Sequence, residues 1–298
     1  MKSIKEIIVL INVNISLFYN KSMAILSSLH THNTFCDGKS SIKEMIESAL
    51  SLNFTSIGIS SHCYTGYSFD TCGIKKERIE EYYNTVLRYK DEYKNRINVY
   101  LGLELESRIE GEERPSLDPR LDYAIGSVHL FRTPNGVFSV DNTPQEWKNA
   151  LSQYNNNYLS LIEVYLDELY NFSRSSSFDI VGHFDLYTKF NEKENLFDEE
   201  DDKYKKLALY YLEKIAKENK IFEVNTGAMS RGWKTKPYPA LFLLERLKKL
   251  NAPIIVTSDS HSKDTLNYGY KETERMLKDL GFTTQMALTD KGWINVAL

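Results

Sequence analysis

The sequence has few of the features that mark secreted, membrane-spanning or nucleic-acid-binding proteins. Only three of its 298 residues are cysteines (Cys36, Cys63 and Cys72), an odd number without a C-x-x-C spacing. This pattern argues against a disulfide framework and favours a reducing compartment, so we expect a cytoplasmic protein. No apolar run reaches the roughly 20 residues that a membrane span needs. With a net charge of −4, the chain has no general electrostatic attraction for nucleic acid.

Several common catalytic motifs are also missing. The sequence has no Walker phosphate-binding loop, no G-x-G-x-x-G and no G-x-S-x-G. Hydrophobic residues make up 42% of the chain and charged residues 26%, which is the composition of an ordinary globular protein. A chain of this length can bury one large core.

The first residues of the chain resemble a signal peptide only in part. Lys2 and Lys5 precede an apolar stretch, as in a signal peptide, but Asn12 and Asn14 interrupt it and no A-x-A cleavage pattern follows. A strand pattern begins directly after Met23. We therefore expect residues 1–22 to be a dispensable extension and residues 23–298 to form one domain.

From Met23 onward, short β-branched runs alternate with longer helical stretches. Strands are predicted at residues 25–29, 55–60, 98–103, 123–127, 179–182, 221–225 and 253–257. Helices are predicted at residues 41–52, 75–93, 144–170, 198–219, 238–250 and 265–280. Strands separated by helices of this size indicate a parallel sheet. We expect an α/β fold, a distorted TIM-like (β/α) barrel with about seven strands, and a doubly wound open sheet is the alternative.

The chain has only six histidines, and all of them follow predicted strands. They are His30, His32, His62, His129, His183 and His261. A single histidine is usually a surface or structural residue. In a parallel barrel, however, the C-terminal ends of the strands meet at one mouth, so all six imidazoles would converge there.

Carboxylates accompany the histidines. Asp37 lies in the loop after the first strand, Glu104 ends the third, and Asp259 lies two residues before His261. Alternate residues of an extended segment face the same way, so His-x-His and Asp-x-His pairs can hold one ion. Mixed imidazole and carboxylate ligands suit zinc, manganese or iron. Nine candidate ligands suffice for two or three divalent ions, whereas Cys63 should point away from its neighbour His62.

At these residues the sequence resembles the PHP (polymerase and histidinol phosphatase) superfamily, and within it the histidinol-phosphate phosphatases. The matching segments, in the family's order, are His30-Thr-His32, Asp37-Gly38, Ser61-His62, Gly102-Leu103-Glu104, Gly126-Ser127-Val128-His129, Gly182-His183-Phe184-Asp185 and Ser258-Asp259-Ser260-His261. The resemblance implies a distorted (β/α)7 barrel with a trinuclear metal site. It also implies a metal-dependent phosphomonoesterase that hydrolyses L-histidinol phosphate in histidine biosynthesis.

The resemblance further implies which residues would share each ion. The first ion would be held by His30, His32, Glu104 and Asp259. Glu104 would bridge to a second ion, held also by His129 and His183. The third ion would be held by Asp37, His62 and His261, and this is the site where family members vary. A stretch from Glu223 to Gly227, followed by Arg231 and Tyr238-Pro239, favours the phosphatase branch.

Three further residues are candidates for catalysis or substrate binding. Arg231 could contact the phosphate through two hydrogen bonds, or be an ordinary surface arginine. Glu106 lies two residues after Glu104 and could meet the substrate's amine or imidazole, or occupy an exposed loop. Asp185 could orient His183 or transfer a proton, or be purely structural. The acidic run at residues 198–202 is predicted to begin a helix.

The sequence is also compatible with two other functions. The chain could be a different phosphoesterase of the same family, acting on a nucleotide or on phosphotyrosine. It could also be a metal-binding regulatory module without activity. The expected partner is a small phosphate monoester, with no nucleic acid and no membrane. Bound divalent ions would attract this anion in spite of the protein's negative net charge.

Overall fold

A parallel, nearly closed sheet organises the structure. In the computed structural model, which describes residues 26–111, 117–175 and 178–298, seven strands pair in the order β1-β2-β3-β4-β7-β8-β9. Their bounds are β1 (Ser27–Ser28), β2 (Ser56–Ile59), β3 (Asn98–Glu106), β4 (Tyr123–Ser127), β7 (Ile180–Val181), β8 (Ile221–Asn225) and β9 (Ile254–Thr257). Beyond β1 and β9 the two edges meet, because the backbone nitrogen of His32 donates to the carbonyl of Ser260 at 2.8 Å. This confirms the distorted seven-stranded barrel rather than the open sheet.

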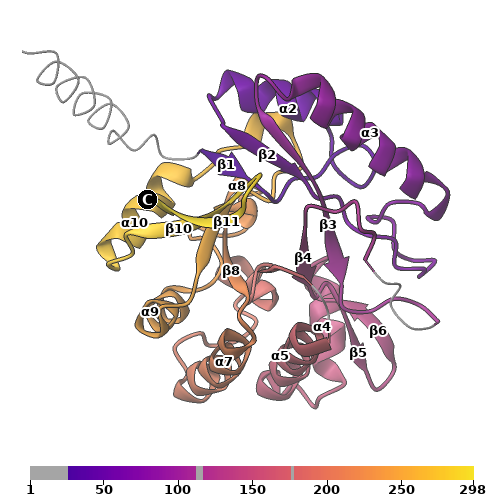
Figure 1. Ribbon diagram of the computed structural model, residues 1–298. Coiled ribbons are helices and arrows are strands. Elements are labelled where there is room, and N and C mark those ends of the chain that lie inside the picture. The colour runs from indigo at the N-terminus through magenta and orange to yellow at the C-terminus, as the bar shows by residue number, and fades with distance from the viewer. Residues whose placement is uncertain (1–25, 112–116, 176–177) are drawn as a thin grey trace, which may run out of the picture.

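Helices surround the barrel (Figure 1). The longer ones are α2 (Ile42–Ser51), α3 (Ile79–Tyr93), α4 (Pro144–Ser152), α5 (Tyr158–Ser175), α7 (Asp202–Ile215), α9 (Leu241–Leu250) and α10 (Tyr270–Asp279). Short turns are η1 (Lys76–Arg78), η2 (Leu186–Thr188), α6 (Asn191–Glu194), η3 (Ala216–Glu218), α8 (Gly227–Ser230) and η4 (Lys263–Thr265). Within the described residues, no helix is long and apolar enough to cross a lipid bilayer.

Helix α2 illustrates how the sequence produces these elements. It begins after Ser41, whose hydroxyl accepts from the backbone nitrogen of Glu44 while the Glu44 carboxylate accepts from the backbone of Ser41. This reciprocal capping box satisfies donors that the first helical turn leaves unpaired. The buried residues Ile42, Met45, Ile46 and Ala49 recur at helical spacing, so one face of the helix packs on the barrel.

The predicted helix at residues 144–170 is divided into α4 and α5. Asn155 and Asn156 adopt left-handed conformations, with φ values of 53° and 60°. Asparagine tolerates this conformation better than most residues, so the run of asparagines ends one helix before the next begins. The acidic run lies at the start of α7, as predicted, but the helix begins at Asp202 rather than at residue 198, and Asp201 caps it by accepting from the backbone nitrogen of Lys203.

Strand ends differ from the predictions by a few residues. β4 and β8 match the predicted ranges, whereas β1 and β7 are only two residues long. β3 continues to Glu106, so Glu104 lies inside the strand rather than beyond its end. Residues 1–22, which we expect to be dispensable, lie outside the described residues.

Two hairpins were not predicted. β10 (Thr284–Thr289) and β11 (Gly292–Ala297) pair at the C-terminus, and Leu288 joins a buried cluster of residues that come mostly from barrel strands. The indole nitrogen of Trp293 donates to Asp179, just before β7, so this hairpin lies at the N-terminal ends of the strands. β5 (Leu130–Thr133) and β6 (Gly136–Ser139) form the second hairpin directly after His129.

Candidate metal centre

The nine candidate ligands converge at the C-terminal ends of the barrel strands. His30 and His32 follow β1, His62 follows β2, Glu104 lies in β3, His129 follows β4, His183 follows β7, and Asp259 and His261 follow β9, while Asp37 lies in the loop after His32. Parallel strands bring their C-terminal ends to the same mouth, which explains how residues 231 positions apart meet. The nine side chains therefore meet at the barrel mouth, as the positions of the histidines predicted.

Glu104 lies at the centre of the group and is only 1% exposed. One carboxylate oxygen, Oε2, faces three imidazoles. It lies 2.8 Å from His62 Nδ1, 3.1 Å from His30 Nε2 and 3.5 Å from His32 Nε2. This oxygen could therefore bind an ion together with histidines that follow two other strands, β1 and β2.

The second oxygen of Glu104 faces a different pair of rings. Oε1 lies 3.1 Å from His183 Nε2 and 3.4 Å from His129 Nε2. The hydroxyl of Ser127 donates to the same oxygen at 2.7 Å. Because the two oxygens serve separate sets of histidines, the arrangement suits a carboxylate that bridges two ions.

An outer group forms around Asp37. His261 Nε2 lies 3.3 Å, and His62 Nε2 3.7 Å, from an Asp37 oxygen. His32 also belongs to this group, since one ligand atom from each of the four residues lies within 4.8 Å of all the others. The resemblance had assigned His32 to the first ion alone, whereas its ring lies between both groups.

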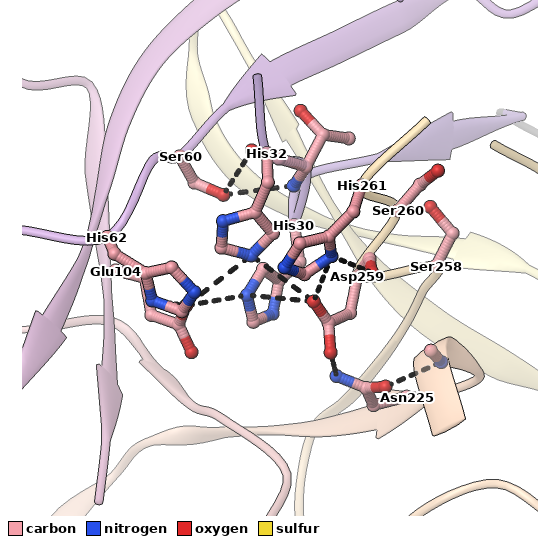
Figure 2. Close-up of polar contacts among 12 residues, drawn as sticks. His30, His32, Ser60, His62, Glu104, Asn225, Ser258, Asp259, Ser260 and His261 are labelled. Carbon is pink, nitrogen blue, oxygen red and sulfur yellow. Dashed lines mark hydrogen bonds and ion pairs between the residues drawn. The ribbon is translucent and has the colours of Figure 1, made fainter. Parts of the chain in front are cut away.

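Asp259 connects the inner and outer groups. Its Oδ1 lies 3.2 Å from His32 Nε2, 3.6 Å from His261 Nδ1 and 3.8 Å from His30 Nε2. Figure 2 shows these rings and the carboxylates of Glu104 and Asp259 pointing toward one another. All of these side chains come from loops or strand ends on one side of the barrel.

The chemistry of these atoms fits divalent cations. Among the described residues, His30 Nε2, His32 Nε2 and Glu104 Oε2 are buried and have no hydrogen-bond partner, although the Glu104 oxygen lies 3.1 Å and 3.5 Å from the two nitrogens. Buried polar atoms normally make hydrogen bonds, and atoms that instead converge on a common point are arranged as ligands. Imidazole nitrogens and carboxylate oxygens are suitable donors for zinc, manganese or iron.

The electrostatics keep the carboxylates ionised. Burial by itself would raise the pKa of Glu104, but the neighbouring His30 and His62 hold that pKa well below its usual range. The same holds for Asp259, where burial is opposed by Arg231 and His30, and the pKa of the carboxyl is again lowered. Ionised carboxylates are the form that binds metal ions.

Glu106 contacts one of the candidate ligand histidines. Its carboxylate is 4% exposed and lies 3.0 Å from His129 Nδ1. It also accepts from the backbone nitrogens of His129 and Leu130. These contacts exclude an exposed loop position for Glu106. Its side chain also lines the cavity in front of the ligands, so contact with the substrate stays a prediction.

Glu223 was noted in the sequence only as part of a phosphatase-like stretch. In the structure it is buried, and its Oε1 lies 2.5 Å from His30 Nδ1. The available signal was a charged residue inside an otherwise apolar strand, between Phe222 and Val224. Sequence position alone did not identify its partner, since His30 lies 193 residues away.

Arg231 lies at the edge of the centre. Its guanidinium donates from Nη2 to Asp259 Oδ2 at 3.0 Å and from Nη1 to the Asp259 carbonyl at 3.2 Å. The side chain is 30% exposed and lines the cavity in front of the ligands. It is therefore held in place by Asp259 rather than free at the surface.

The cavity in front of the ligands has a volume of about 530 Å³. Its lining includes His62, His129, Lys189 and Arg231 together with the apolar side chains of Phe69 and Phe138. The β5–β6 hairpin contributes part of this wall. Cys63 also lines the cavity, but its sulfur accepts from the backbone nitrogen of Glu106, and no cysteine belongs to a ligand group among the described residues.

Asp185 is completely buried and does not contact His183 through any hydrogen bond between described residues. Its Oδ2 accepts from the backbone nitrogen of Ala240 at 2.9 Å. Burial, only partly offset by Lys234, raises the pKa of Asp185 to about 6. These contacts support the structural alternative for Asp185, and a part in catalysis stays a prediction.

We expect Asp185→Asn to stabilise the metal-free protein at pH 8 relative to the wild type. The asparagine keeps an acceptor for Ala240 and removes a buried charge. With a folded pKa of about 6 against about 3.9 in the unfolded chain, ionisation costs up to about 3 kcal/mol above pH 6 and nothing below pH 4. Urea unfolding of chelator-treated protein from pH 4 to pH 8 measures the difference. If the difference in unfolding free energy between Asp185→Asn and the wild type does not increase from pH 4 to pH 8, the raised pKa of Asp185 is contradicted.

Comparisons with known proteins agree with this geometry. Residues 28–227 match the PHP domain family. A protein of Schizosaccharomyces pombe named "Probable histidinol-phosphatase" is 28% identical over 89% of this chain and 90% of its own length. A crystal structure from Listeria monocytogenes covers 83% of this chain and 99% of that one, with a TM-score of 0.72 at 19% identity.

A second solved structure covers 91% of this chain and 99% of its own, with a TM-score of 0.64 at 19% identity. It is the histidinol phosphate phosphatase of Lactococcus lactis, complexed with zinc, L-histidinol and phosphate. The two crystal structures share the barrel, and the sequence match extends from β1 beyond β8. The chain therefore belongs to the PHP domain family.

Proposed function

We propose that this protein is a metal-dependent phosphomonoesterase that hydrolyses L-histidinol phosphate to L-histidinol and phosphate. The observation that carries the proposal is the convergence of nine imidazoles and carboxylates, seven of which line one cavity. Similarity to the S. pombe protein over most of both chains supports the choice of substrate. The Lactococcus lactis fold relative was crystallised with both products of this reaction.

We assign two or three divalent ions, of zinc, manganese or iron, to the nine ligands. One ion would be held by His30, His32, Glu104 and Asp259, a second by Glu104, His129 and His183, and a third by Asp37, His62 and His261. His32 lies close enough to take part in the third group as well. Bound ions would polarise the phosphate oxygens and lower the pKa of an attacking water.

The protein's own residues prepare the site for an anion. Arg231 presents its guanidinium to the cavity while Asp259 fixes its orientation, which suits contact with a phosphate oxygen. Lys189 adds a second cation, although its amine is paired with Asp141 at 2.9 Å. The walls formed by Phe69 and Phe138 give the organic part of a substrate an apolar surface.

The cysteines are consistent with the expected cytoplasmic location. None of the three forms a disulfide bond among the described residues, and Cys36 and Cys63 are partly buried. Histidine biosynthesis, in which the proposed reaction is a step, would then proceed in the same reducing compartment.

A phosphomonoester panel tests the proposal. Purified protein loaded with Zn²⁺, Mn²⁺ or Fe²⁺ is assayed with L-histidinol phosphate, nucleoside monophosphates and phosphotyrosine. We expect the highest kcat/KM for histidinol phosphate. A preference for a nucleotide or phosphotyrosine would overturn the substrate assignment. Ion binding without hydrolysis of any ester would instead favour a regulatory module.

We expect Arg231→Ala to lower kcat/KM about 10- to 100-fold. The change removes hydrogen bonds to a charged group, which contribute about 1.5–3 kcal/mol. Arg231→Lys should recover only part of the loss, because an ammonium lacks the planar fork of the guanidinium. Metal analysis of both variants is the control, since Arg231 also holds Asp259. Full activity in Arg231→Ala with unchanged metal content would exclude the phosphate contact.

A further inference from the structure

The carboxylate of Glu223, on β8, makes polar contacts with residues that belong to other parts of the barrel. We propose that Glu223 is a positioning residue that fixes the tautomer and orientation of His30 and links it to the segment carrying His183. The inference rests on the proposed metal centre, because the role assigned to Glu223 is to orient a metal ligand, His30.

Four donors surround the Glu223 carboxylate. On Oε1 these are His30 Nδ1 at 2.5 Å and the Thr257 hydroxyl at 2.6 Å. On Oε2 they are the backbone nitrogen of His183 at 2.7 Å and the Asn225 amide at 3.0 Å. One side chain on β8 therefore contacts residues that follow β1 and β7 and a residue at the end of β9.

The burial of Glu223 makes these contacts strong. The residue is 1% exposed, and His30 is fully buried. Hydrogen bonds to an ionised group are shorter and stronger than neutral ones, and an unpaired carboxylate in this position would be costly. The Thr257 hydroxyl, the His183 backbone nitrogen and the Asn225 amide all donate to this side chain, so both of its oxygens accept, as those of an ionised carboxylate do.

An ionised carboxylate can only accept hydrogen bonds, and this determines the state of the His30 ring. Nδ1 must carry the hydrogen that it shares with Glu223, which leaves the lone pair of a neutral imidazole on Nε2. Nε2 is the atom that faces Glu104 Oε2 at 3.1 Å and Asp259 Oδ1 at 3.8 Å. Glu223 thus turns the ligand nitrogen of His30 toward the other ligands.

A second histidine, His129, is also contacted at Nδ1 by a buried glutamate. Glu106 accepts from His129 Nδ1 at 3.0 Å, while His129 Nε2 faces Glu104. His32 differs, because its Nδ1 lies 3.6 Å from the sulfur of Cys36 and 4.0 Å from Asp37. Orientation by a buried carboxylate is therefore a property of particular ligands and not of every histidine in the cluster.

The test compares Glu223→Gln with Thr257→Val. A glutamine has only one acceptor oxygen for the four donors, and its amide hydrogens would face other donors. Thr257→Val removes one hydrogen bond to the same oxygen but leaves the contact between Glu223 and His30 intact. Both variants are stripped of metal and titrated with Zn²⁺ against a chelator and with Co²⁺ by absorption spectroscopy. Thermal unfolding of the metal-free proteins measures any general structural damage.

We expect Glu223→Gln to weaken at least one Zn²⁺ affinity by about 10- to 100-fold and to alter the Co²⁺ spectrum. Thr257→Val should keep a Zn²⁺ affinity and a Co²⁺ spectrum close to those of the wild type, even if it loses as much thermal stability as Glu223→Gln. Wild-type affinity and spectrum in Glu223→Gln would overturn the inference, whether or not its stability falls. If Glu223→Gln does not fold, Glu223→Asp replaces it, because it keeps the charge but draws the carboxylate away from His30. The aspartate variant should also lose affinity, and wild-type affinity in it would overturn the inference.

These readouts separate the inference from the proposed function. Wild-type protein that binds no divalent ion would remove the metal centre and with it the proposed function. Wild-type protein that binds ions, together with an unaffected Glu223→Gln, would remove only the positioning role. In the active enzyme, Glu223→Gln should lower kcat more than it raises KM, since His30 does not line the cavity.

Discussion

Glu104→Gln will lower kcat/KM by more than about 1,000-fold. Each oxygen of Glu104 faces its own set of histidines, and the amide group of glutamine would direct hydrogens toward one set. Divalent ions supply several kcal/mol of charge stabilisation in the transition state, and about 4 kcal/mol corresponds to 1,000-fold in rate. Steady-state hydrolysis of histidinol phosphate measures the loss, and metal analysis should show fewer bound ions.

The matched control is Glu163→Gln, the same change on the exposed face of α5. It should leave kinetics and metal content unchanged. A Glu104→Gln protein that retains both its ions and more than a tenth of its activity would show that Glu104 does not bridge the two histidine groups.

Gly102→Ala will destabilise the protein by about 3 kcal/mol, because the barrel has no room for a side chain there. A Cβ at Gly102 would lie 2.4 Å from Cζ and 2.6 Å from Cε1 of Tyr123. Tyr123 cannot easily move, since it is 3% exposed and its hydroxyl donates to the carbonyl of Leu29. We expect the melting temperature to fall by about 6 °C or more in calorimetry.

A double-mutant cycle tests the cause of this loss. A leucine at position 123 has no atoms where the far carbons of the tyrosine ring lie, so Gly102→Ala should be less harmful in a Tyr123→Leu background. Equal losses in both backgrounds would show that the ring is not the obstacle. Because Gly102 lies two residues before Glu104 on β3, we also expect reduced activity in the single variant.

The outline of the barrel could be predicted because local patterns determine it. Short strand-like runs identified β4 and β8 with their observed bounds, and α2 lies within the helix predicted at residues 41–52. The hairpins β5–β6 and β10–β11 were missed. One strand of each hairpin, β6 or β11, is only partly buried along its length, so it lacks the continuous apolar run that marks a barrel strand.

Orientation within the site could not be predicted in the same way. The spacing of Glu104 and Glu106 placed both on one side of β3, but only the fold shows that Glu106 accepts from His129. Asp185 lies two residues after His183, yet its carboxylate bonds Ala240, 55 residues further along the chain. Sequence spacing predicts which face a residue occupies, whereas its partner depends on the strands and loops that pack against that face.

The sequence by itself determined the class of fold and the place where the candidate metal ligands meet. Six histidines that each follow a strand must meet, because parallel strands of a barrel share one C-terminal mouth. The tertiary structure alone decided how these ligands are held: Glu104 facing two groups, Asp259 tied to Arg231, and Glu223 bound to His30. These are contacts between residues far apart in the chain, and their geometry depends on barrel closure, which no local pattern encodes.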